Sequence, residues 1–146
     1  MICIVQRVLE AKVTVDGEVV GAIGPGMLVL AAVERDDAEA QIQWTAGKLA
    51  GLRIFRSGEK HFEADVLQAG GEILLVSNFT VAAQTRKGRR PSLDSAAAPE
   101  AAEPMFNRLV EAVRALGVTV QTGRFGASMQ VSLINDGPAT FIVETE

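Results

Sequence analysis

With 146 residues, of which 48% are hydrophobic and 22% charged, the chain has the length and composition of one globular domain over residues 1–146, which excludes a disordered tail. The net charge of −4 argues against a protein that coats nucleic acid nonspecifically, so we expect no general binding of DNA. The single cysteine, Cys3, excludes an internal disulfide, and the alternating residues around it predict a small buried side chain rather than a reactive thiol.

The chain opens with segments in which apolar residues alternate with polar ones or run together, and both patterns predict β-strands. These strands are expected over residues 2–8, 12–15, 18–23 and 27–33. Asp16-Gly17 is a strong signal for a hairpin turn between the second and the third. Asp36 or Asp37 can cap a helix that runs to about Leu52.

The rest of the chain predicts a second helix between further strands. Strands are expected at 54–55 and over 72–76, 118–120, 128–134 and 140–143. An apolar stripe at helical spacing follows Pro99 and ends at Gly117. Pro104 removes a backbone donor, so this helix either begins near Glu103 or kinks there. The order of elements predicts a single compact α/β domain with a mixed, mostly antiparallel, partly curled sheet and helices packed on one side.

Two short segments each close a predicted strand with small, polar or backbone-exposing residues. They are Ser77-Asn78-Phe79-Thr80-Val81 and Asn135-Asp136-Gly137-Pro138-Ala139-Thr140. In the second, the Gly-Pro step tolerates unusual backbone angles and removes an N–H donor. The result is a stretch of exposed carbonyl groups, which can act as a recognition surface made of main chain.

The two segments resemble the paired signatures of the D-aminoacyl-tRNA deacylases, Ser-Gln-x-x-Leu and Asn-x-Gly-Pro-Val-Thr. Further segments are similar to the family in the same order: Gln6-Arg7-Val8, Leu52-Arg53-Ile54-Phe55, Gly88-Arg89-Arg90-Pro91-Ser92 and Thr122-Gly123-Arg124-Phe125-Gly126-Ala127. The resemblance therefore covers nearly the whole chain. The departures are Asn78 for Gln, Val81 for Leu, Ala139 for Val, and Phe62-Glu63 where the family usually has Met-Asn.

The resemblance implies a homodimeric hydrolase that cleaves the ester of D-aminoacyl-tRNA, and of mischarged glycyl-tRNA, without a cofactor. In the family, Gly137-Pro138 corresponds to a cis step that one subunit inserts into the active site of the other. Its carbonyls would hold the α-amino group of the substrate, while their bulk would exclude an L side chain. The family also implies that main-chain atoms and the ribose hydroxyl of the substrate do most of the chemistry.

The usual hydrolytic residues are missing from the chain. His61 is the single histidine, and we expect it at the surface rather than in a triad. No His, Cys, Asp and Glu cluster has the spacing of a metal site, so no metal is expected. An aminoacyl ester is an activated bond that needs donors aimed at the developing oxyanion, and the backbone N–H groups of Phe79 and Thr80 are the candidates.

The candidate catalytic residues are therefore Ser77, Asn78, Phe79 and Thr80. The hydroxyl groups of Ser77 and Thr80 could instead bond only to the backbone of their own turn. Thr80 could also be a hydroxyl nucleophile, which would make the protein a different kind of esterase, although no base is apparent to activate it. A third possibility is a non-catalytic homologue that binds the end of a tRNA.

Four cations, Arg86, Lys87, Arg89 and Arg90, fall within five positions on an otherwise acidic chain. Such a local basic loop suits a partner that presents a few phosphates at one place, so we expect it to hold the acceptor end of tRNA. On charge alone, a merely solvated loop is the alternative.

The N-terminal residues alternate and soon meet Gln6, Arg7 and Glu10, unlike a signal peptide. No apolar run approaches the roughly 20 residues that a membrane-spanning helix needs. We therefore expect a cytoplasmic protein with no membrane partner.

Overall fold

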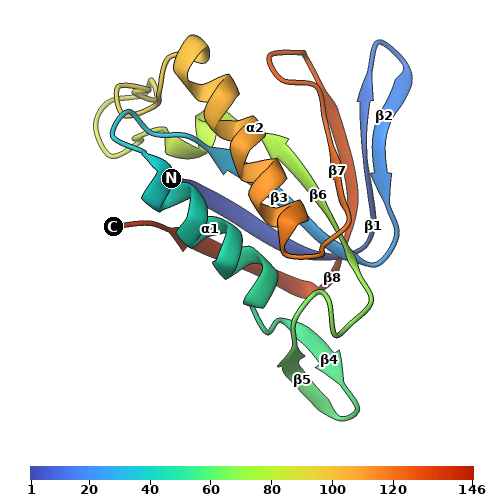
Figure 1. The fold of residues 1–146 in the computed structure, drawn as a ribbon. Helices are drawn as coiled ribbons and strands as arrows, with labels where there is room; N and C mark the ends of the chain where they lie inside the picture. Colours follow the sequence, from blue (N-terminus) through green and yellow to red (C-terminus); the bar gives the residue numbers. More distant parts are fainter.

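The computed structural model describes all residues from 1 to 146, as eight strands, two helices and one short 3₁₀ turn (Figure 1). The strands are β1 (Ile2–Val15), β2 (Glu18–Ile23), β3 (Gly26–Ala32), β4 (Phe55–Ser57), β5 (Lys60–Ala64), β6 (Glu72–Ser77), β7 (Val120–Thr122) and β8 (Gln130–Glu144). The helices are α1 (Glu39–Gly51) and α2 (Pro99–Ala115), and the 3₁₀ turn is η1 (Phe79–Ala82). Neither helix is both long enough and apolar enough to cross a membrane.

The sheet is built around β1, which pairs antiparallel with β3 and β2 along one edge and with β8 along the other. Beyond β3, β6 and then β7 add in parallel, while β4 and β5 form a separate hairpin. The two helices lie together over one face of the curled sheet (Figure 1). This arrangement confirms the predicted mixed α/β class with helices on one side.

The main core lies between the sheet and the helices. Cys3, Val29 and Leu75 point from the sheet toward Leu49 of α1 and Leu109 of α2, and all five side chains are fully buried. Burial of such apolar side chains stabilises the fold by about 1.5–3 kcal/mol each. A smaller cluster covers part of the opposite face of the sheet.

Two pairs of predicted strands are single long strands in the structure. The segments 2–8 and 12–15 are both parts of β1, because β8 pairs with the strand along both segments, with register irregularities near Val8. In the same way, the predicted strands 128–134, from residue 130 onward, and 140–143 are both parts of β8. Strand β7, which precedes β8, lies two residues later than predicted, at 120–122 rather than 118–120.

The predicted helix boundaries are partly wrong. Helix α1 is preceded by Ala38, whose N–H donates to the side-chain oxygen of Gln41 at 2.8 Å. The cap residue is therefore neither Asp36 nor Asp37. Asp37 instead accepts from the backbone N–H of Glu34 at 2.7 Å. Helix α2 begins at Pro99, where the missing N–H of a proline costs nothing. Of the two alternatives for this helix, the start near Glu103 is therefore wrong, and Pro104 lies inside the helix.

Candidate active site

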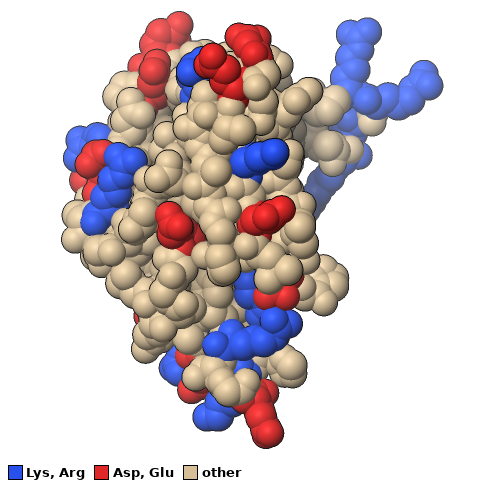
Figure 2. Space-filling view, turned by 90° about the vertical axis from the view of Figure 1, so that its right-hand side faces the viewer, with Lys and Arg blue, Asp and Glu red and all other residues tan.

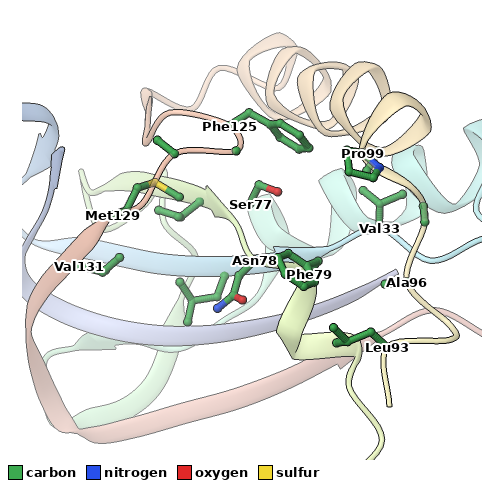
Figure 3. Close-up of a pocket in the computed structure, with 16 residues that line it drawn as sticks. Val33, Ser77, Asn78, Phe79, Leu93, Ala96, Pro99, Phe125, Met129 and Val131 are labelled. Atoms are coloured by element: carbon green, nitrogen blue, oxygen red, sulfur yellow. The ribbon is translucent and has the colours of Figure 1, made fainter. Parts of the chain in front are cut away.

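An apolar pocket of about 610 Å³ opens beside the end of β6, between the start of α2 and the segment that leads into β8 (Figure 3). Four separate parts of the chain line it: β3 with the residue after it, the end of β6 with its following turn, residues 93–102 up to and within the start of α2, and residues 125–131, which lead into β8. Labelled side chains around it are Val33, Ser77, Asn78, Phe79, Leu93, Ala96, Pro99, Phe125, Met129 and Val131. None of the lining residues has an ionisable side chain.

The turn after β6, residues 77–80, is held by Asn78 and is called the pocket turn below. The N–H of Asn78 donates to the carbonyl of Ala31 at 2.8 Å, which extends the pairing of β6 with β3. Its side-chain oxygen accepts from the N–H of Thr80 at 3.2 Å and from the hydroxyl of Thr80 at 2.5 Å. An asparagine in this position caps the 3₁₀ turn as it would cap a helix.

Of the two expected main-chain donors, only the N–H of Phe79 is free, because the N–H of Thr80 is bonded to Asn78. The carbonyl of Asn78 accepts from the N–H of Val81 at 3.2 Å. Since a peptide unit is planar and trans, the N–H of Phe79 points in the direction opposite to this carbonyl, away from the turn. The pocket turn thus presents one preorganised main-chain donor.

The hydroxyl of Thr80 has no base beside it, as a nucleophile would need. It donates to the amide oxygen of Asn78, which is not a base and cannot take the proton. Ser77 lines the pocket beside it. The geometry therefore favours a positioning role for Thr80.

The second motif forms an exposed bulge on β8. The Gly137-Pro138 peptide bond is cis, and both residues are exposed. Asn135 closes the bulge from below: its side-chain oxygen accepts from the N–H of Ala139 at 2.7 Å, and its amide nitrogen donates to the hydroxyl of Thr140 at 2.9 Å. The small side chain of Ala139, the departure from the family's valine, is buried.

Arg7 of β1 supports this bulge from inside the protein, and it is only 4% exposed. Its Nε donates to the carbonyl of Asp136 at 3.0 Å, and one terminal nitrogen donates to the carbonyl of Ile54 at 2.8 Å. The guanidinium also lies over the ring of Phe62, 5.6 Å from its centre. Sequence reasoning assigned Arg7 no role, although it occupies an inward position of β1, two residues after Val5, where a charged residue needs buried partners.

The two motifs do not meet within one chain. Ser77 pairs with Ala31, which pairs with Cys3, whereas the bulge lies opposite Arg7 on the far side of β1. They are thus separated by three strand spacings, about 14 Å, and by four residues along β1, about 13 Å. The separation is roughly 20 Å, and neither residue of the Gly-Pro step lines the pocket.

The remaining candidates lie at the surface. Arg86, Lys87, Arg89 and Arg90 are exposed on the loop that precedes the pocket residue Leu93. His61 is exposed on β5, as predicted. Glu63, which stands where the family usually has Asn, has its charge balanced by Arg53 at 2.9 Å and Lys60 at 3.7 Å. No group of three or more His, Cys, Asp or Glu side chains lies together as a metal site would require.

Comparison with other sequences covers nearly the whole chain. The sequence model of the D-Tyr-tRNA(Tyr) deacylase family matches residues 4–144. The D-aminoacyl-tRNA deacylase of Symbiobacterium thermophilum is 52% identical over 143 residues, which is 98% of this chain and 95% of that protein. The protein of the same name from Desulfitobacterium hafniense (strain DSM 10664 / DCB-2) is 51% identical over 98% of this chain and 96% of its own length.

Two solved structures share the fold over nearly the whole chain. A protein described as c-Myc DNA Unwinding Element Binding Protein superposes with a TM-score of 0.94 at 37% identity, over 100% of this chain and 99% of that one. A probable eukaryotic D-amino acid tRNA deacylase shares the fold, with a TM-score of 0.81 at 19% identity over 97% of this chain and 98% of that one. The chain therefore belongs to the D-Tyr-tRNA(Tyr) deacylase family.

Proposed function

We propose that this protein is a D-aminoacyl-tRNA deacylase, an enzyme that hydrolyses the ester between a D-amino acid and tRNA. The observation that carries the proposal is the free N–H of Phe79 at the wall of a pocket without ionisable side chains. Relatives of that name, about half identical over nearly the whole chain, support the same reaction.

The pocket chemistry suits an ester and would not suit an amide. An aminoacyl ester is already activated, so a main-chain donor that stabilises the oxyanion, and a positioned nucleophile, are sufficient. No side chain of the pocket can act as a general base near neutral pH. The ribose hydroxyl next to the ester is therefore assigned the role that a protein base has in other hydrolases.

Chiral selection is assigned to the Gly-Pro step of a second copy of the chain. Within one chain this step lies roughly 20 Å from the pocket turn, so it can contribute to catalysis only across a homodimer. Its exposed carbonyls would bind the α-amino group and exclude an L side chain by contact. Glycine has no side chain to exclude, so glycyl-tRNA should also be cleaved.

The test compares D-tyrosyl-tRNA, L-tyrosyl-tRNA and glycyl-tRNA as substrates of the same preparation. We expect rapid release of D-tyrosine, slower release of glycine, and no release of L-tyrosine above the spontaneous rate. Equal hydrolysis of the two tyrosyl esters would refute the chiral assignment. Tight binding of tRNA without turnover would identify a non-catalytic tRNA-end binder instead.

A mixing experiment tests whether the Gly-Pro step acts between subunits. One variant, Phe79→Pro, lacks the pocket donor, and the other, Gly137→Ala, has an altered Gly-Pro step. If the site is shared, mixed dimers contain one intact site, and D-selective activity returns when the two inactive or unselective variants are combined. If both motifs act within one chain, mixing restores nothing.

A further inference from the structure

The loop over residues 85–91, called the basic loop, has a fixed base. Gln84 and Ser92 exchange two backbone hydrogen bonds, with N–H to oxygen distances of 2.8 and 2.9 Å. Gly88 turns the chain at the tip with a φ of +69°. The loop lies beside the start of α2 (Figure 1), so its tip reaches away from the body on a closed stem.

The cations of this loop are not neutralised by the protein. Arg86, Lys87, Arg89 and Arg90 are all exposed, and no carboxylate lies within 4 Å of any of them. Several cations elsewhere in the chain do have carboxylate partners, as in the ion pairs of Arg53, Arg56, Arg108 and Arg114. Figure 2 shows basic side chains projecting from the far edge of the molecule, at the upper right, with no acidic side chain among them.

The loop is continuous with the wall of the pocket. Leu93 and Ala96, which follow it directly, line the pocket. The hydroxyl of Ser95 donates to the carbonyl of Ala82 at 3.0 Å and so ties the end of the loop to the turn η1. Only two residues, Pro91 and Ser92, separate Arg90 from Leu93, so the cations begin within about 10 Å of the pocket wall.

We propose that the basic loop binds the phosphodiester backbone of the single-stranded RNA end whose terminal nucleoside carries the ester. This inference rests on the proposed function. A nucleoside ester held at the pocket turn has its preceding phosphates just outside the pocket, where the loop lies. The loop sequence, Thr-Arg-Lys-Gly-Arg-Arg-Pro, contains no aromatic or amide side chain, and its four cations suit the phosphates that an RNA strand of any sequence presents.

The proposal gives a quantitative salt dependence. Each phosphate contact with a single strand contributes about −0.7 to the slope of log affinity against log salt concentration, so four contacts give about −2.8. The double variant Arg89→Gln/Arg90→Gln should halve this slope to about −1.4 and raise KM severalfold or more at low salt. Its kcat should stay unchanged, because the loop does not touch the ester.

The matched control removes the same charge elsewhere. Lys12 and Lys48 are exposed and have no carboxylate partner, so Lys12→Gln/Lys48→Gln changes the net charge equally. We expect its KM and salt slope to match those of the wild type. An equal loss in this control would mean that net charge alone attracts tRNA, and it would overturn the proposal.

A second substrate separates the loop from the chemistry. A D-aminoacyl adenosine ester carries no phosphates, so the wild type and the loop variant should cleave it equally. Equal impairment of the loop variant on this ester and on aminoacyl-tRNA would overturn the proposal. If the wild type cleaves neither substrate, the proposed function fails. Binding of uncharged tRNA then tests the loop alone. If the loop variant binds this tRNA with the same salt slope as the wild type, the proposed role of the basic loop is refuted.

Discussion

The Nε of Arg7 donates to the main-chain oxygen of Asp136 at 3.0 Å, which connects the central strand β1 to the residue just before the Gly-Pro step. The carboxylate of Asp136 also lies 3.4 Å from the same nitrogen, and it forms an ion pair with the exposed Arg56 at 3.0 Å. The position of the bulge therefore depends on side chains far from it in the sequence.

Replacing Arg7 with leucine should destabilise the protein. The change leaves the carbonyls of Ile54 and Asp136 without their donor, so the free energy of unfolding should fall by about 2–3 kcal/mol. Urea unfolding measures this change. Arg53→Leu is the control, because that exposed guanidinium pairs only with Glu63, and its loss should cost less than about 1 kcal/mol. Equal losses in both would contradict the buried role of Arg7.

Replacing Gly137 with alanine should weaken chiral selection. An added Cβ would lie 2.7 Å from the backbone nitrogen of Ala139 and 3.3 Å from a terminal nitrogen of Arg7, at a φ of +149° that side chains rarely adopt. The bulge must shift, so the ratio of D-tyrosyl to L-tyrosyl hydrolysis should fall by about tenfold or more, as expected for a loss of about 1.4 kcal/mol of discrimination. Gly24→Ala, where a Cβ meets nothing within 4 Å, should keep the wild-type ratio.

Replacing Phe79 with proline removes the proposed oxyanion donor and little else from the backbone. Phe79 is the first residue of η1, where a proline is tolerated, and Asn78 before it is already extended, with φ −147° and ψ 92°. We expect kcat to fall by about 10²–10³-fold relative to Phe79→Ala, which removes the ring but keeps the N–H. Single-turnover hydrolysis of D-tyrosyl-tRNA measures this. Similar rates for the two variants would mean that the N–H does not act on the ester.

Replacing Thr80 with valine should leave the reaction almost intact. Valine loses only the hydroxyl that donates to Asn78 and keeps the backbone N–H that Asn78 also caps. Activity should stay within about tenfold of the wild type, the effect of a change of about 1 kcal/mol in one hydrogen bond. Complete loss with the fold intact, together with a covalent adduct at Thr80 in mass spectra, would instead identify a threonine nucleophile.

Cys3 should be unreactive in the folded protein. Burial raises the pKa of its thiol from 9.0 to about 12, so the thiolate that reagents attack is scarce at pH 8. A thiol-specific reagent should modify Cys3 only after denaturant is added. The unfolded chain releases this proton from about pH 9 and the folded chain only near pH 12, so stability should fall with rising pH across that interval, by up to about 1.4 kcal/mol per pH unit. Cys3→Ala should lack this component.

Local patterns were enough to predict much of the fold. The Asp16-Gly17 turn forms as predicted, with both residues at positive φ, because turn chemistry depends on neighbours in sequence. The apolar run over residues 27–33 is nearly continuous, which is typical of a strand buried on both faces, and the corresponding strand β3 is buried in this way. By contrast, the merging of two predicted strands into β1 depends on how β8 pairs with it, and no short window of sequence contains that pairing.

In the candidate site, too, the local features were predictable and the long-range contacts were not. The pocket turn was predicted because its residues are consecutive, but the side chain of Asn78 occupies a donor that had been counted as free. Leu93 and Phe125 join the pocket from distant parts of the chain, and Arg7 reaches the bulge across 129 residues. Such contacts are products of the tertiary fold, so sequence patterns could not have shown them.

Strand β1 is flanked along most of its 14 residues by partners on both edges, with β8 on one side and β3 or β2 on the other. It is the common backbone of two remote features: β3 and β6 extend from it to the pocket turn, and its Arg7 fixes the bulge. Its central amides should be the slowest in the chain to exchange with deuterium, since only global unfolding exposes them. Heat or denaturant should accordingly abolish ester cleavage and chiral discrimination in one cooperative transition, with no intermediate that hydrolyses both enantiomers.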